Sequence, residues 1–94
     1  MTVKIFIKRH VIQEYELELS TLLKKIRSMT LNQPGYISGE TLRRLDRADE
    51  VIVISTWRTI EDWDKWYQSE QRMIIQNEID MLLGEDTEYA IYGE

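Results

Sequence analysis

The sequence predicts an α+β fold of the ferredoxin-like type: the element order β-α-β-β-α-β, a four-stranded antiparallel sheet and the helices on one face of it. Strand-like and helix-like spacings of apolar residues alternate along the chain in that order. Val51–Ile54 is an unbroken run of β-branched residues, which is typical of a strand buried on both faces. The chain has 94 residues, so we expect a single domain spanning residues 1–94.

The first half of the chain supplies two strands and a helix. Thr2–His10 predicts a strand, because one side of it would carry Val3, Ile5 and Ile7 and the other Lys4, Phe6 and Lys8. Gln13–Met29 predicts an amphipathic helix, which should end at Asn32–Gly35 because Pro34 disfavours helical geometry in the residue before it. Tyr36–Leu45 has strand character, and the polar segment Asp46–Asp49 predicts a turn. The apolar stripe of the helix consists of Tyr15, Leu19, Leu22, Leu23, Ile26 and Met29.

The second half begins with the Val51–Ile54 strand and ends with another. Thr59 is the expected N-cap of a helix, with the Asp62 carboxylate placed to bond back in a capping box. Ser69–Gln71 predicts a break, so two short helices should meet at a bend, and Gly84 is the expected C-terminal cap. Thr87–Tyr92 predicts the final strand, with Tyr89 and Ile91 on one side and Ala90 and Tyr92 on the other.

Helices on one face leave the second face of the sheet uncovered. That face should present Phe6, one set of residues from Val51–Ile54, and Ala90 with Tyr92, or their alternates. Leaving several hundred Å² of apolar surface wet would forgo on the order of 10 kcal/mol. A second copy is the simplest cover, since two-fold pairs are the commonest oligomers. We therefore expect a homodimer that packs through the open sheet faces as an α+β barrel.

Composition restricts the classes of partner and chemistry. The net charge of −5 argues against a nucleic-acid partner or an anionic membrane surface, because phosphate binding needs clustered lysine and arginine. The chain has no cysteine, which excludes disulfides and thiolate chemistry. The acidic cluster Asp46, Asp49 and Glu50 lacks the ligand spacing of a calcium loop, so no metal site is expected. No membrane span or leader is apparent, which favours an intracellular, cytoplasmic protein.

Three segments resemble a known family. They are QPGYISGETLRR, then DEVIVISTWRTIEDWDKWYQSEQ, then the terminal TEYAIY. Their P-G-Y-x-S strand entry, E-V-x-x-x-x-x-W strand and W-x-x-W-x-x-S helix are similar to those of the antibiotic biosynthesis monooxygenase family of dimeric α+β barrels. The resemblance implies one such domain over nearly the whole chain. It also implies one of three functions: a cofactor-independent oxygenase, a haem-degrading monooxygenase, or a small protein without a known reaction.

The resemblance also provides a test of the haem-degrading branch. Its staphylococcal members use an asparagine on the first strand, a tryptophan on the helix after the third strand and a histidine ligand about ten residues further on. Trp66 falls at the tryptophan position, whereas Ile7 and Gln76 fall at the asparagine and histidine positions. Gln76 lacks the imidazole that holds the iron in such proteins. A haem oxygenase of this type is therefore disfavoured, and no cofactor is expected.

The remaining enzyme hypothesis is a cofactor-independent monooxygenase acting on a quinol or small aromatic substrate. It needs a group that takes a phenol proton, a polar contact for the anion and an apolar cavity between sheet and helices. His10 and Tyr36 are the candidate catalytic residues; a surface position for His10 and half-buried packing for Tyr36 are the alternatives. The aromatic residues expected to contact a substrate are Trp66, Trp63, Tyr67 and Phe6. Because no acid–base pair is visible, a non-catalytic dimeric module that binds the same small molecules stays open.

Overall fold

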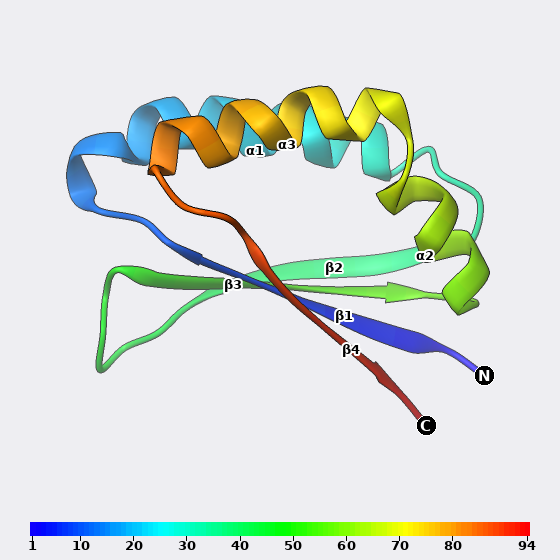
Figure 1. The fold of residues 1–94 in the computed structure, drawn as a ribbon. Helices are drawn as coiled ribbons and strands as arrows, with labels where there is room; N and C mark the ends of the chain where they lie inside the picture. The colour runs from blue at the N-terminus through cyan, green and yellow to red at the C-terminus, as the bar shows by residue number, and fades with distance from the viewer.

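A computed structural model describes residues 1–94 and shows one sheet with its helices on a single face (Figure 1). The elements are β1 (Val3–His10), a 3-10 turn (Gln13–Tyr15), α1 (Glu16–Thr30), β2 (Tyr36–Arg43), β3 (Glu50–Trp57), α2 (Ile60–Tyr67), α3 (Glu70–Leu83) and β4 (Glu88–Gly93). The sheet order is β2-β3-β1-β4 and the three strand pairs are antiparallel. This confirms the predicted ferredoxin-like α+β fold. None of the helices is long and apolar enough to cross a membrane.

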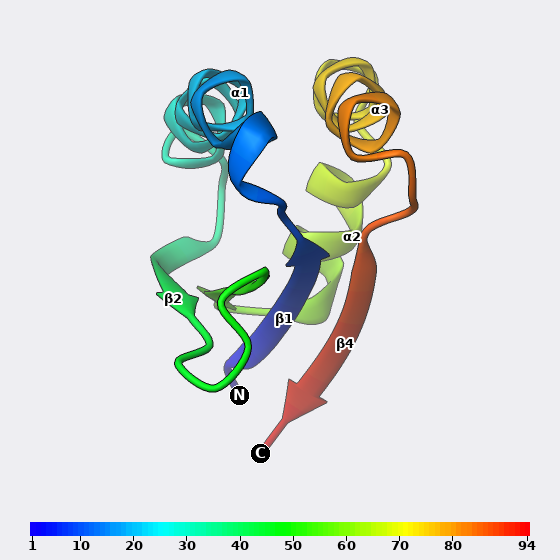
Figure 2. The same cartoon turned by 90° about the vertical axis from the view of Figure 1, so that its left-hand side faces the viewer.

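The helices form a layer over the sheet. Figure 2 shows α1 and α3 side by side above it, with α2 lower, near β3. The layer buries two apolar clusters against the sheet. The first consists of Val3, Ile5, Trp57, Trp63 and Trp66, and the second of Val11, Leu19, Val51, Ile75 and Ile79. Four polar residues are buried with them: Arg9, Ser55, Arg72 and Gln76. These polar residues are the unusual feature of the core.

The pairing register decides which side chains face the helices. Ile5 pairs with Ser55, and Phe6 pairs with Ile54. Since successive strand residues point to opposite faces, Ile5 and Ser55 face the helices while Phe6 and Ile54 face away. In β4, Tyr89 pairs with Ile7 and Ala90 with Phe6, which confirms the two sides predicted for the final strand. The open face, defined here as Phe6, Ile52, Ile54, Ala90 and Tyr92, has no cover from the helices.

The helix ends follow the predicted caps with one difference. The Thr59 hydroxyl oxygen accepts a hydrogen bond from the backbone N–H of Asp62 at 3.1 Å. The Asp62 carboxylate accepts from the Thr59 hydroxyl at 3.0 Å, so it does not complete the expected capping box by reaching the Thr59 backbone N–H. The predicted break lies between α2 and α3, where the Ser69 side chain caps α3. Gly84 ends α3 with φ of 73°, as predicted.

Candidate functional site

A cavity lies between the sheet and the helix layer, and every strand except β4 and all three α-helices contribute to its walls. Its free volume is about 80 Å³. The inner lining consists of two half-buried residues, Ile7 and Val53, and of the buried residues Arg9, Ser55, Trp57, Trp63, Trp66, Arg72 and Gln76. Exposed residues of α1 and β2, including Arg27, Glu40 and Thr41, line its mouth. An apolar cavity of about 150 Å³ can hold benzene, so a ligand here would be single-ringed and would extend toward the mouth.

Aromatic side chains form one wall. Trp66 is 3% exposed and Trp63 is equally buried, because both lie on the inward face of α2. Trp57 of β3 packs edge-on against Trp63 and against Tyr36, with ring centroids 5.8 and 5.4 Å apart. Its indole N–H donates to the Ser55 hydroxyl at 3.1 Å. The wall is therefore rigid and presents aromatic surface to a planar ligand.

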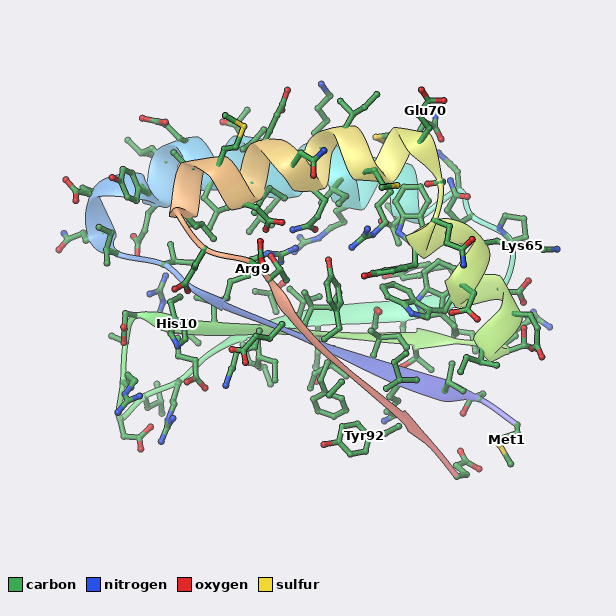
Figure 3. The ribbon with its side chains drawn as sticks, viewed as in Figure 1. Met1, Arg9, His10, Lys65, Glu70 and Tyr92 are labelled. Atoms are coloured by element: carbon green, nitrogen blue, oxygen red, sulfur yellow. The ribbon has the colours of Figure 1, made fainter.

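Another part of the lining carries a buried guanidinium. Arg9 lies near the end of β1, on the same face as Val3, Ile5 and Ile7, and is 6% exposed. Its Nη2 donates to Gln76 Oε1 at 3.3 Å, whereas its Nε–H has no hydrogen-bond partner in the protein. Burial lowers the pKa of Arg9, against smaller opposite effects of Tyr89 and Asp80; repulsion from Arg72 adds a still smaller lowering. Figure 3 shows Arg9 between the sheet and the helix layer.

Gln76 is oriented by the residues beyond it. Its Nε2 donates to Asp80 Oδ1 and to Thr87 Oγ1, both at 2.8 Å. The Thr87 hydroxyl in turn donates to Asp80 Oδ1 at 2.9 Å. With the amide nitrogen occupied in this way, the amide oxygen of Gln76 faces Arg9. Asp80 thus acts on Arg9 through a neutral amide instead of forming an ion pair with it.

A second buried guanidinium belongs to Arg72, in the first turn of α3. Its Nη1 donates to the Tyr67 carbonyl at 3.1 Å and its Nη2 donates to the Tyr89 hydroxyl. The guanidinium lies over the rings of Tyr67 and Tyr89, with centroids at 4.6 and 5.3 Å. Burial raises the pKa of Tyr89, against a smaller opposite effect of Arg72, so the hydroxyl is neutral at pH 7.

The two buried guanidiniums have no counter-ion. No carboxylate lies within 4.0 Å of Arg9 or Arg72; the ion pairs of the chain involve Lys8, His10, Arg43 and Arg44 instead. Burying a charge without a partner is costly. The cavity is therefore electropositive, although the whole chain carries a net charge of −5.

The structure brings together some of the residues singled out from the sequence. Trp63, Trp66 and Tyr36 line the cavity. Tyr67 lies behind its lining, packed on Trp63 at 5.6 Å and under the Arg72 guanidinium.

The other two predicted residues lie elsewhere. His10 pairs with Glu50 at the end of β1, and its Nδ1 lies 2.8 Å from Glu85 Oε1. Phe6 lies on the open face, where it packs edge-on against Tyr92 at 5.0 Å. Figure 3 shows His10 at one end of the sheet and Tyr92 on the side opposite the helices. Neither His10 nor Phe6 lines the cavity.

Sequence reasoning missed Arg9 and Arg72, although both leave a signal. Arg9 continues the inward-facing series of β1, in which every second residue is apolar up to that point. Arg72 has the spacing of the inward-facing residues of α3, three before Ile75 and seven before Ile79. A charged residue at a core position in each of two elements indicates a polar site between those elements.

The positions that the haem comparison assigned meet in this cavity. Ile7, Trp66 and Gln76 all line it. The amide of Gln76 is engaged by Arg9, Asp80 and Thr87, and the only histidine lies on the other face of the sheet. The residues present therefore do not fit a histidine-ligated haem. No group of three or more His, Asp or Glu side chains is arranged to hold a metal ion.

Comparison with known proteins gives a consistent family and fold. The model of the family described as "Antibiotic biosynthesis monooxygenase" matches residues 2–73. A search of curated proteins found no match. Among solved structures, a conserved protein from Methanosarcina mazei Go1 superposes with a TM-score of 0.90 at 21% identity, covering 100% of this chain and 93% of that one.

Two further solved structures show the same fold. A variant of SnoaB, a cofactor-independent oxygenase from Streptomyces nogalater, has a TM-score of 0.86 at 14% identity, covering 99% of this chain and 92% of that one. Rv0793 from Mycobacterium tuberculosis has a TM-score of 0.85 at 15% identity, covering 100% and 95%. At these identities the likeness concerns the fold alone.

Proposed function

Because this chain belongs to the antibiotic biosynthesis monooxygenase family, we propose that it is a cofactor-independent monooxygenase acting on a quinol or other small aromatic compound. One observation supports this beyond the family. The cavity joins a tryptophan wall to the guanidiniums of Arg9 and Arg72, neither of which has a carboxylate within 4.0 Å. An aromatic ring fits the first of these features, and an oxyanion on that ring fits the second.

The proposed monooxygenation needs no cofactor, because the substrate supplies the electrons. One atom of O₂ enters the substrate and the other leaves as water, so the substrate itself loses two hydrogens and supplies the electrons. An ionised phenol reacts more readily with O₂ than the neutral form. Arg9 and Arg72 would favour the ionised form, because a nearby positive charge lowers the pKa of a phenol. Trp66 and Trp63 would hold the ring, and the Tyr36 hydroxyl would be a further polar contact from the sheet.

We further propose that the protein acts as a homodimer. Phe6, Ile52, Ile54, Ala90 and Tyr92 form an apolar strip on the open face that the chain's own helices do not cover. A second copy related by a two-fold axis would bury this strip and close the two sheets into a barrel. The cavity lies on the other side of the sheet, so each subunit would keep its own site.

Oxygen consumption with a panel of quinols tests the proposed reaction. We expect wild-type protein to consume O₂ with at least one quinol and to transfer one ¹⁸O atom from ¹⁸O₂ into the product. Trp66→Ala should lose most of this activity, as should Arg72→Gln, whereas His10→Ala should keep it. Absence of turnover on every quinol that binds would contradict the proposal.

A non-catalytic binding module is the second candidate. It is favoured by the absence of an acid–base pair: the cavity lining contains no histidine, and its one carboxylate, Glu40, belongs to an exposed residue. The same assay separates the two functions. Measurable binding of aromatic ligands without oxygen uptake would support the module.

A further inference from the structure

The two buried arginines are more than a phenol or quinol substrate requires. Arg9 comes from the sheet and Arg72 from the first turn of α3, and both side chains line the same cavity. Each is more than nine-tenths buried, and neither has a carboxylate within 4.0 Å. Two like charges buried near one another destabilise the free protein, and Asp80 offsets the charge of Arg9 only from beyond ion-pair distance. A ligand of opposite charge in the cavity would compensate them more directly.

The donor geometry narrows the kind of anion. The Nε–H of Arg9 is shielded from solvent and has no partner, while Nη2 of the same group is held by Gln76. Gln76 is fixed by Asp80 and Thr87, so the Arg9 guanidinium has a set orientation. A free N–H on a planar, oriented guanidinium suits a carboxylate oxygen. The free volume of about 80 Å³ also favours a small planar group over a bulkier tetrahedral one.

The charge state of the ligand at neutral pH also favours a carboxylate. A phenol has a pKa near 10 in water, so it would enter the cavity neutral and could not offset two positive charges without giving up a proton. No histidine lines the cavity, so the proton released when Arg9 and Arg72 favour the ionised phenol would have to pass to solvent through the mouth. A carboxylic acid, with a pKa near 4, is already ionised at neutral pH. Its binding would therefore neutralise charge without any proton transfer.

We propose that the inner part of the cavity, at Arg9 and Arg72, is a carboxylate-binding subsite, and that the natural ligand is a single-ring aromatic acid. The carboxylate accepts from the Arg9 guanidinium and lies within the field of Arg72, while the ring packs against Trp63 and Trp66. This inference rests on the proposed function only in taking the cavity to be the substrate site. It concerns recognition, so it can be tested by binding alone.

Isothermal titration calorimetry with an isosteric ligand pair tests the subsite. The probes are 2,5-dihydroxybenzoate and 2,5-dihydroxybenzamide, which share the quinol ring and differ in charge. Wild-type protein should bind the acid about tenfold or more tightly than the amide at pH 7, because hydrogen bonds to charged groups are stronger than neutral ones. Equal affinities, or a preference for the amide, would overturn the proposal without any variant being made.

Variants then test whether Arg9 causes the preference for the acid over the amide. Arg9→Met should reduce the ratio of the two affinities to about one while changing amide binding much less, since the methionine still fills the cavity wall. Arg43→Met, which removes an exposed arginine paired with Glu16 at 2.9 Å, should keep the wild-type ratio. Near-ultraviolet circular dichroism checks that Arg9→Met retains its tertiary structure. A well-folded Arg9→Met that keeps the full preference for the acid would refute the assignment to Arg9.

The binding experiment does not depend on whether the protein turns over a substrate. If the acid binds selectively but no O₂ is consumed, the subsite stands and the monooxygenase proposal fails. If neutral quinols are oxidised and the acid gains no affinity over the amide, the monooxygenase stands and the subsite fails.

Discussion

A hydrogen bond of 3.3 Å from Arg9 Nη2 to Gln76 Oε1 joins the central strand β1 to α3, across 67 positions of sequence. This hydrogen bond takes the place of an ion pair between Arg9 and a carboxylate. Asp80 holds the far side of the Gln76 amide, so the nearest carboxylate of this network is separated from Arg9 by a neutral group. The Arg9 guanidinium is therefore held in position while its positive charge is not neutralised. This property is expected of a group that binds an anionic ligand.

Arg9→Met should stabilise the protein. The lowered pKa of Arg9, caused mainly by burial, means that folding with the charged side chain costs free energy at neutral pH. Removing the charge should raise the free energy of unfolding by about 1 kcal/mol or more, even after loss of the bond to Gln76. Urea unfolding at pH 7 measures this, with Arg43→Met as an exposed control that should change by less than about 0.5 kcal/mol. A less stable Arg9→Met would show that the Gln76 bond outweighs desolvation.

The fold could be predicted because the pattern of this chain is locally consistent. Alternation in Val3, Ile5 and Ile7, and the continuous run Val51–Ile54, fix both strand type and position before any contact is known. Thr59 and Gly84 mark helix ends through their own chemistry. Such signals are local, and the structure follows them to within a few residues at each boundary.

The site could be predicted only in its aromatic half. Trp63 and Trp66 are large, apolar and three residues apart, a spacing that indicates a shared inward face of α2. The placement of Arg9 depends on the pairing of β1 with β3, and its orientation depends on Gln76, 67 residues away. The inward position of Arg9 is indicated by its alternation with Ile5 and Ile7, but its contact with Gln76 has no local signature. From the sequence, His10 is a candidate catalytic residue because its imidazole can transfer protons near neutral pH. It follows Arg9 by one residue in β1, so its side chain points to the opposite face of the sheet, away from the cavity.

Gly35→Ala should destabilise the protein much more than Gly84→Ala. Gly35 has φ of 85°, its carbonyl accepts from the Arg58 N–H at 2.8 Å, and an added Cβ would lie 2.6 Å from the Asp62 Cβ. Gly84 has a similar φ of 73° but open space around it. We expect a loss of about 1 kcal/mol for Gly84→Ala from backbone strain alone, and at least about 2 kcal/mol for Gly35→Ala. Equal losses in urea unfolding would show that Asp62 moves aside freely.

Tyr89 should make the protein sensitive to alkaline pH. Burial raises the folded-state pKa of Tyr89 above its unfolded value of about 10. As pH rises past 10, the unfolded chain releases this proton first, so the native state holds more protons and the free energy of unfolding falls. The contribution of neutral Tyr89 to the free energy of unfolding is fully present below pH 10. It is lost as the pH rises through the folded-state pKa of Tyr89. Tyr89→Phe should flatten this fall, whereas Tyr15→Phe should not; an unchanged slope in Tyr89→Phe would contradict the prediction.

Trp66→Ala should remove a large part of the total stability. The indole is 3% exposed within the first apolar cluster, and truncation of a buried tryptophan costs about 3–5 kcal/mol. That is a sizeable fraction of the roughly 5–15 kcal/mol available to a small domain. Tyr67→Ala, one residue further on but exposed, should cost about half as much or less. Chemical denaturation of both variants makes the comparison, and similar losses would mean that Trp66 is not part of the packed core in solution.

Ile54→Arg should convert a dimer into a monomer. Ile54 lies at the centre of the open face, paired with Phe6 on one side and Glu40 on the other. In the proposed assembly an arginine there would be buried in the apolar contact between the two sheets, where removing its charge from water costs several kcal/mol even beside Glu40 of the neighbouring strand. Sedimentation velocity at micromolar concentration should give the mass of two chains for wild type and of one for Ile54→Arg. Ile74→Arg, at a 58% exposed position of α3 away from the sheet, should remain dimeric. A folded wild-type monomer would remove the basis of the dimer, since the apolar strip would then be tolerated in water.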